Sequence, residues 1–279
     1  MSLRKKKSWI KDLEAAYLEE RLVVKSNQKK LQYFIQFKKA FFGEFKEHFF
    51  HVTECFCQDD KKSRSAFYKE IKRLSLVMKK TEKIKRMAIT VDVDDVVSRE
   101  FFSKLGILTY TELVGDTKKS LKLLEKSISV NKSIKISKLK KEEINPLSKL
   151  DQASHIADKT SRMRGIFMKP DALKEMRNFY KMLLKNNACF VAKVDKKLAG
   201  NIGFFVDKKN KFGLIACIFV ANDFKGRGVS KILYKTVLEE FKKRKLSHFI
   251  GASTTTGVLK LATQIGRKPS RHVYLVKIN

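Results

Sequence analysis

The stretch from Ile218 to Leu233 reads IFVANDFKGRGVSKIL, and it contains the change of pattern on which the rest of the chain depends. It completes an apolar run that starts at Leu214, passes through a polar segment with two glycines, and enters apolar residues at helical spacing. This pattern predicts a strand, a tight glycine loop and a helix. The first N–H groups of such a helix are free to bind an anion, and glycine lets a phosphate approach the backbone closely. We therefore expect a phosphorylated ligand at this loop.

Three residues of the loop stand at the defining positions of a known motif. Lys225, Gly228 and Ser230 resemble the pyrophosphate-binding pattern Arg/Gln-x-x-Gly-x-Gly/Ala of the GNAT superfamily of N-acetyltransferases, with conservative departures at the first and last places. The segment is not a dinucleotide-binding fingerprint, because the third glycine of that pattern is missing. It is not a nucleotide P-loop either, because no Gly-Lys-Ser/Thr follows.

The resemblance implies an α/β fold, the acyl-CoA N-acyltransferase (GNAT) fold, in which helices flank a mixed, mostly antiparallel sheet. It also implies that an amine attacks the thioester of acetyl-CoA directly, with acetyl-CoA as the co-substrate. Main-chain groups of the strand would hold the pantetheine, the loop and helix start would hold the pyrophosphate, and a hydroxyl would replace an asparagine common after the fifth strand. The implied cofactor-binding residues are Ile218, Phe219, Val220, Lys225, Gly226, Arg227, Gly228, Val229, Ser230, Lys231 and Thr255.

The catalytic residues are not readable from the resemblance. Many family members carry a glutamate on the strand before the loop, but residues 213–220 contain no carboxylate. Many carry a tyrosine four residues before the glycine that closes the last helix, and Ala262 stands there in this chain. Asp223 and Tyr274 remain as acid–base candidates by residue type alone. For Tyr234, which falls inside an amphipathic helical pattern, core packing is the preferred interpretation.

The order of elements occurs twice, which predicts a tandem pair of domains, 1–125 and 126–279. Leu31 corresponds to Leu198, Phe56 to Phe219 and Gly106 to Gly266 at nearly constant spacing. The helices and strands expected in the first copy are Trp9–Glu20, Leu22–Val24, Leu31–Phe37, Phe49–Phe56, Ala66–Met78, Met87–Val91, Arg99–Leu105 and Ile107–Leu113. Those expected in the second are Ile134–Ile136, Ile144–Ile156, Met163–Met168, Asp171–Lys185, Cys189–Val194, Gly200–Val206, Phe212–Val220, the helix ending near Lys245, His248–Ala252, Gly257–Gln264 and His272–Ile278.

The first copy has lost the glycine loop. Its counterpart is QDDKKSRS at Gln58–Ser65, which contains no glycine. Two acidic residues, Asp59 and Asp60, stand where pyrophosphate would bind. We therefore expect the first copy to be a degenerate domain that does not hold the cofactor in the usual way.

Composition limits the remaining possibilities. The formal charge of +33, from 62 Lys and Arg against 29 Asp and Glu, favours phosphate-bearing partners such as coenzyme A, nucleic acid or the ribosome. The lysines are scattered rather than grouped, which favours solvated faces. The four cysteines lie in apolar runs without metal-ligand spacing, so we expect reduced thiols and no metal site. No window reaches the length of a membrane span, and we expect a soluble, cytoplasmic protein without a membrane partner.

Three hypotheses follow. The first is an enzyme, an acetyl-CoA-dependent N-acetyltransferase acting on an unidentified primary amine. The second is a transferase of the tandem type that takes aminoacyl-tRNA. The third is a non-catalytic module that binds coenzyme A or nucleic acid, because both acid–base positions are vacant.

Overall fold

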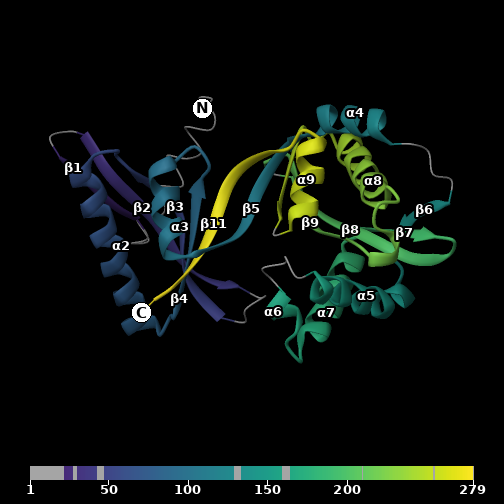
Figure 1. Ribbon diagram of the computed structural model, residues 1–279, viewed down its shortest axis with the longest axis horizontal. Coiled ribbons are helices and arrows are strands. Elements are labelled where there is room, and N and C mark those ends of the chain that lie inside the picture. The colour runs from purple at the N-terminus through teal and green to yellow at the C-terminus, as the bar shows by residue number, and fades with distance from the viewer. Residues whose placement is uncertain are drawn as a thin grey trace. The chain divides into compact units, whose positions relative to one another are not determined.

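A computed structural model describes residues 22–27, 30–42, 47–128, 133–158, 164–208, 210–253 and 255–278. The chain divides into two compact units, one of residues 1–111 with 270–279 and the other of residues 112–269. The predicted helix at Trp9–Glu20 lies outside the described residues. Figure 1 shows the elements of both units.

The first unit is a sheet with helices packed on it. Its strand order is β1-β2-β3-β4-β11-β5. β1, β2 and β3 are antiparallel neighbours, β4 runs parallel to β3, and β11 runs antiparallel to β4. The elements are β1 (Leu22–Asn27), β2 (Lys30–Phe42), β3 (Glu47–Cys57), α2 (Lys61–Glu82), β4 (Arg86–Asp92), α3 (Val96–Leu105), the first part of β5 (Ile107–Asp116) and most of β11 (Lys268–Lys277).

The second unit repeats this plan with additional helices. Its strand order is β5-β10-β9-β8-β7-β6, with β10 parallel to β9 and the strands from β9 to β6 antiparallel. The elements after β5 are α4 (Thr117–Ser127), β6 (Ile134–Lys138), η1 (Lys141–Glu143), α5 (Ile144–Ala157), α6 (Arg164–Phe167), α7 (Ala172–Lys185), β7 (Cys189–Val194), β8 (Lys197–Asp207), β9 (Phe212–Val220), η2 (Asn222–Phe224), α8 (Val229–Lys243), β10 (His248–Ser253) and α9 (Thr256–Gln264).

Two irregularities occur at matching places in the two units. A bulge leaves Thr53 of β3 without a partner on β2, and an equivalent bulge leaves Ala216 of β9 without a partner on β8. The parallel neighbour pairs with only part of each of these strands, over Phe50–Val52 in β3 and Phe212–Ile215 in β9. The last residues of β3 and β9 therefore separate from the parallel strand. Shared irregularities of this kind support a duplication more strongly than the low sequence similarity does.

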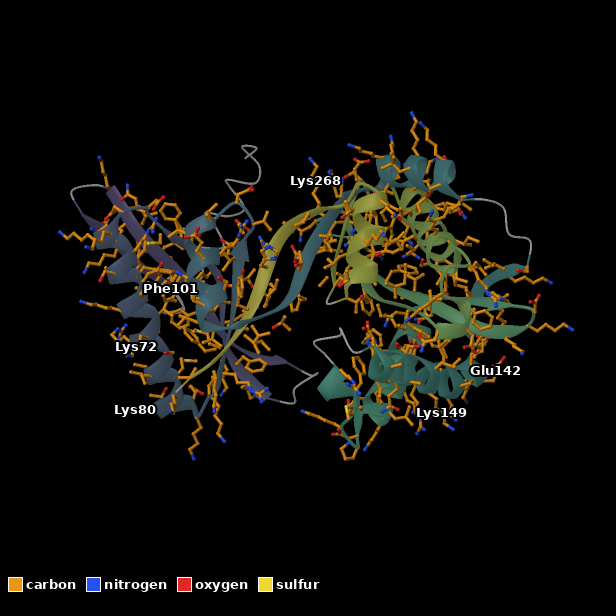
Figure 2. All side chains as sticks on the ribbon, in the orientation of Figure 1. Lys72, Lys80, Phe101, Glu142, Lys149 and Lys268 are labelled. Carbon is orange, nitrogen blue, oxygen red and sulfur yellow. The ribbon has the colours of Figure 1, made fainter. Side chains whose placement is uncertain are left out.

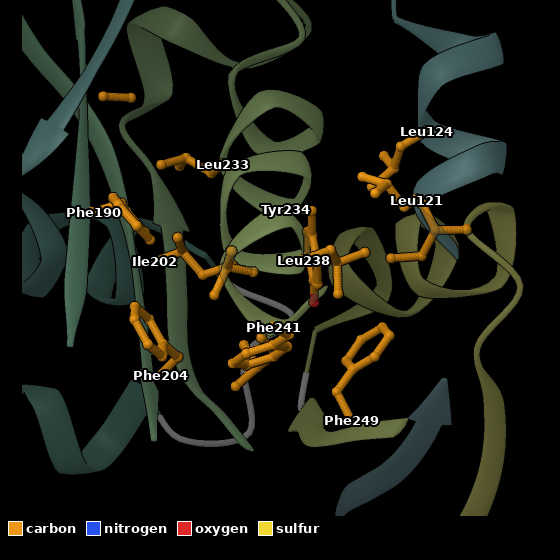
Figure 3. Close-up of a cluster of buried hydrophobic side chains, with 14 of the residues drawn as sticks. Leu121, Leu124, Phe190, Ile202, Phe204, Leu233, Tyr234, Leu238, Phe241 and Phe249 are labelled. Atoms are coloured by element: carbon orange, nitrogen blue, oxygen red, sulfur yellow. The ribbon is translucent and has the colours of Figure 1, made fainter. Parts of the chain in front are cut away.

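The core of the second unit explains why α8 forms. Buried side chains recur along α8 at helical spacing, and they pack against β7, β8, β10 and α4. Figure 3 shows Tyr234, Leu238 and Phe241 of α8 between Phe204 on one side and Leu121 on the other. The prediction that Tyr234 is a core residue is confirmed, since its side chain is fully buried.

The charged residues lie mainly on solvated surfaces, as the scattered lysines predicted. Lys72 and Lys80 of α2 and Lys149 of α5 project away from the sheets in Figure 2, and all three are exposed. The net charge is therefore compatible with a folded core and does not by itself mark a binding surface.

One arginine is an exception to this distribution. Arg267 is 3% exposed, and its guanidinium donates to the carbonyl oxygens of Leu113 and Gly251, at 2.8 Å each, and to Tyr234 Oη at 2.9 Å. These acceptors belong to β5, β10 and α8, so one buried side chain connects three elements of the second unit.

The expected order of elements is confirmed, with two corrections. The helix expected at Ala66–Met78 begins at Lys61, because Asp60 caps it, so most of the segment expected as a loop is helical. The last strand begins at Lys268 rather than His272, and residues 270–279 belong to the first unit. The predicted boundary between the two copies, after residue 125, stays a prediction. The compact units are defined by contacts within the fold, and they do not mark where a duplicated segment begins.

Candidate functional site

The glycine loop has the backbone geometry that the sequence predicted. Gly226 and Gly228 have φ values of 79° and 83°, in the left-handed region that residues with a Cβ rarely adopt. A Cβ at either position would meet nothing within 4 Å. The two glycines are therefore required by the path of the chain, and the space in front of the loop is open.

The N-terminus of α8 is uncapped. Gly228 is the N-cap residue, it provides no side-chain hydrogen bond, and the first turn contains no acidic residue. The helical ladder begins with the N–H of Ile232, which donates to Gly228 O at 3.2 Å. The N–H groups of Val229, Ser230 and Lys231 precede this ladder, so they are available to an anion at the positive end of the helix dipole.

A cavity of about 990 Å³ opens in front of this helix end, inside the second unit. All of the predicted cofactor-binding residues line it: Ile218, Phe219, Val220, Lys225, Gly226, Arg227, Gly228, Val229, Ser230, Lys231 and Thr255. The structure therefore brings together one set of residues from β9, the loop, α8 and the start of α9. Their role as ligand contacts stays a prediction.

The end of β9 presents backbone groups to this cavity. The pairing of β10 with β9 ends at Ile215, while β9 continues to Val220 and keeps its pairing with β8. The edge of residues 216–220 that faces away from β8 is therefore left without a strand partner, within the described register. An extended ligand can form hydrogen bonds with such an edge as an added strand would.

Positive side chains surround the cavity. Lys225 and Arg227 are exposed, and the Arg227 guanidinium lies 5.5 Å from the centre of the Phe224 ring. Lys231 Nζ donates to Ser127 O at the end of α4, at 3.1 Å, so this ammonium is held in place. Lys260 of α9 also lines the cavity. The field in the cavity favours an anionic ligand.

The two catalytic candidates do not lie at the cavity. Asp223 is exposed on η2 and is not among the lining residues. Tyr274 is 5% exposed and packs in the hydrophobic core of the first unit. Ala262, which stands where the family often has a tyrosine, is fully buried. These three positions offer no acid–base group to the cavity.

Several lining residues have no signal in the sequence. Ser127 is the last residue of α4 and Ile128 follows it, and Ala157 and Asp158 lie where α5 ends. They belong to helix ends whose position depends on tertiary packing, so no local motif marks them. Within the described residues, no group of His, Cys, Asp and Glu has the arrangement of a metal site.

The first unit closes the equivalent helix end with its own carboxylate. Asp60 is the N-cap of α2, and its Oδ1 accepts the N–H of Ser63 at 2.8 Å. Hydrogen bonds from Ser63 lower the pKa of Asp60 below its usual value. Asp59 forms an ion pair with Arg64 in the same segment. A carboxylate of the chain itself therefore occupies this helix end, and the failure of the first copy to hold the cofactor stays a prediction.

The comparisons with known proteins agree with this geometry. Residues 155–274 match the model of the acetyltransferase (GNAT) family. No curated protein matches the sequence. Within the described residues, no helix is long and apolar enough to span a membrane.

Three solved structures share the fold at low identity. A tandem GNAT protein from the clavulanic acid biosynthesis pathway has a TM-score of 0.54 and 11% identity, with 93% of this chain and 84% of that chain covered. A GCN5-related N-acetyltransferase from Sphaerobacter thermophilus has a TM-score of 0.60 and 8% identity, with 98% and 85% covered. A GNAT-family acetyltransferase from Colwellia psychrerythraea has a TM-score of 0.50 and 11% identity, with 99% and 97% covered. The GNAT fold is thereby confirmed, and the tandem neighbour supports the interpretation as two copies.

Proposed function

We propose that this chain transfers an acetyl group from acetyl-CoA to a primary amine, because its residues 155–274 match the model of the GNAT acetyltransferases, a family that generally uses acyl-CoA. The amine attacks the thioester directly. The copy at residues 126–279 carries the reaction, and the copy at residues 1–125 is degenerate. The observation that supports this proposal best is the uncapped start of α8, facing a cavity lined by Gly226 and Gly228.

The residues present fit the coenzyme. Its pyrophosphate needs several N–H donors and positive charge, and Val229, Ser230 and Lys231 provide the donors at the positive end of α8. Its pantetheine arm is an extended amide chain, and residues 218–220 provide an edge of β9 without a strand partner on that side. The open space in front of both glycines allows the phosphates to reach the backbone.

When bound, the coenzyme supplies an acyl group that is activated as a thioester. The chain contributes position and polarity. The N–H groups along the end of β9 are oriented by the β8–β9 pairing, so they are in place to stabilise negative charge on the thioester oxygen. The walls formed by β9, α8 and α9 hold the coenzyme and the amine together, which lowers the entropic cost of the encounter.

Calorimetry with acetyl-CoA and thiol-release assays with primary amines test the proposal together. The expected result is binding of acetyl-CoA by the wild type, with release of coenzyme A when an accepted amine is present. Absence of acetyl-CoA binding would refute the proposal. Binding of tRNA that weakens steeply with salt, without acetyl-CoA binding, would indicate the aminoacyl-tRNA-dependent alternative. Binding of acetyl-CoA without turnover on any amine would indicate the non-catalytic alternative.

A further inference from the structure

A second recess opens in the second unit, away from the cavity at the glycine loop. Its volume is about 530 Å³, and it lies between the start of α5 and the second half of α7, two helices that pack against each other (Figure 1). The described residues that line it are Lys141, Ile144, Asn145, Arg177, Lys181 and Leu184. None of them lines the cavity at the glycine loop. The recess is therefore a separate hollow, and its volume is in the range of small-molecule sites.

The floor of the recess is apolar. Ile144 is 7% exposed and belongs to the hydrophobic core that α5 and α7 share, and Leu184 is partly buried against the same core. A ligand with an apolar part that covers these two side chains removes the rest of their surface from water, which favours binding.

Three cations surround this floor. Lys141 lies in η1, and Arg177 and Lys181 are four residues apart on α7, so these two lie on one face of that helix. Among the described residues that line the recess, none is acidic. Ile144 and Asn145 are the first two residues of α5, so the positive end of the helix dipole adds to the same field. The recess therefore favours a negatively charged ligand.

The charge of these cations is not neutralised within the described part of the chain. The side chains of Lys141, Arg177 and Lys181 form no ion pair with a described residue. Glu143, which lies between η1 and α5, is 5% exposed and forms an ion pair with Lys193 at 2.5 Å. This carboxylate is therefore already paired and does not line the recess.

Arg177 distinguishes the recess from an ordinary solvated basic surface. Its Nε is buried and has no hydrogen-bond partner among the described residues. Arg64 and Arg267 also have an unpaired Nε, but their guanidinium groups form hydrogen bonds through Nη atoms, which that of Arg177 does not. A buried donor without an acceptor is costly, and a planar guanidinium matches the oxygens of a phosphate or carboxylate. An anion in the recess would supply the missing acceptor.

We propose that this recess binds a small organic anion, in which a phosphate, sulfate or carboxylate group is joined to an apolar part. Arg177 and Lys181 bind the charged group, and Ile144 and Leu184 contact the apolar part. An inorganic ion alone would leave the apolar floor uncovered.

This site is independent of the coenzyme site proposed above. Ile144, the first residue of α5, lines the recess, and Ala157, its last residue, lines the cavity at the glycine loop. The 14 residues of α5 separate the two by about 20 Å, at about 1.5 Å of rise per residue. We therefore expect both to be occupied at the same time.

Calorimetry with three probes tests the two parts of the ligand. Phenyl phosphate has a charged group and an apolar ring, inorganic phosphate has only the charge, and benzyl alcohol has only the ring. We expect phenyl phosphate to bind the wild type about tenfold more tightly than inorganic phosphate, and benzyl alcohol not to bind. Saturating coenzyme A should leave the binding of phenyl phosphate unchanged.

Four variants locate the binding. Arg177→Gln and Lys181→Gln should each weaken phenyl phosphate binding by about 10- to 100-fold, because each removes charged donors from the anion. Lys149→Gln is the matched control, since Lys149 is an exposed lysine of α5 that does not line the recess. Arg227→Gln changes the other cavity and should bind phenyl phosphate like the wild type. Lys181 is exposed, so Lys181→Gln stays informative even where Arg177→Gln lowers stability.

Several results would overturn the proposal. They are absence of phenyl phosphate binding by the wild type, equal binding by the wild type, Arg177→Gln and Lys181→Gln, and loss of binding in Arg227→Gln or with coenzyme A present. Equal affinity for phosphate and phenyl phosphate would overturn the apolar part of the ligand. Binding of an RNA oligonucleotide that Arg177→Gln weakens, without phenyl phosphate binding, would indicate a nucleic-acid surface instead. These measurements do not involve acetyl transfer, so their failure would leave the proposed function unaffected.

Discussion

The starts of α2 and α8 have different N-cap residues, and the N-cap residue of one can be introduced into the other by mutation. Asp60 caps α2 of the first unit with its carboxylate, and Gly228 leaves α8 of the second unit uncapped. The substitution Gly228→Asp places a carboxylate at the uncapped end. We predict that it abolishes acetyl-CoA binding while the fold is kept.

The geometry sets the size of two effects of Gly228→Asp, the loss of folding stability and the loss of acetyl-CoA affinity. The cost to stability is about 1–2 kcal/mol for a side chain at a φ of 83°, without a steric clash, because a Cβ there meets nothing within 4 Å. Partial capping of the helix offsets part of this cost. The cost to binding is larger. Each hydrogen bond to a charged group contributes about 1.5–3 kcal/mol, and two like charges about 4 Å apart add about 1–4 kcal/mol of repulsion. A total above about 3 kcal/mol corresponds to more than about 100-fold in Kd.

Calorimetry and thermal unfolding measure the two effects separately. Gly228→Ala introduces the same backbone strain without the charge, so its affinity should fall between those of the wild type and Gly228→Asp. Gly165→Asp makes the same change of composition at a glycine with open space that does not line the cavity, and it should bind like the wild type. If Gly228→Asp bound acetyl-CoA within about threefold of the wild type, the phosphate would not lie at this helix end.

Three further predictions concern stability. Asp60→Ala should destabilise the first unit through loss of the cap to Ser63, and it should create no acetyl-CoA site there; denaturant unfolding and calorimetry check both outcomes. Arg267→Leu should cost about 3–5 kcal/mol, because it leaves buried carbonyls and a hydroxyl without their donor, and urea unfolding followed by fluorescence should show the midpoint shift. Burial lowers the pKa of His51 to about 4, below its usual value of 6.5, so the unfolded chain binds the proton first and stability falls as pH drops from about 6.5 to about 4. The loss reaches about 3 kcal/mol, and His51→Asn should remove that part of the pH dependence in unfolding titrations.

Local signals in the sequence predict the backbone of the candidate site. The strand, glycine loop and helix around Gly228 follow from an apolar run, two glycines and a helical period, all of which act over a few residues. The apolar spacing predicts a start of α2 at Ala66, which is too late, because the helix begins directly after its cap, Asp60. An aspartate three residues before Ser63 is also a helix N-cap signal, and the structure uses it as one.

Non-local features were not predictable in this way. Nothing near residues 270–279 indicates that they belong to the first unit, because strand partners are chosen by the packing of distant segments. The bulges at Thr53 and Ala216 likewise depend on the neighbouring strand. Asp223 was a candidate by residue type, and it does not line the cavity.

The two units share one part of the architecture and differ in another. Both units keep the bulged third strand and its separation from the parallel neighbour, so these features occur with either a capped or an uncapped helix start. The helix start differs, because the chain there either presents free N–H groups beside a glycine or satisfies them with its own carboxylate. A free helix end costs stability that a cap would restore. The helix end is uncapped at Gly228 and capped at Asp60. This difference is expected if only the second unit binds an anionic ligand at its helix start.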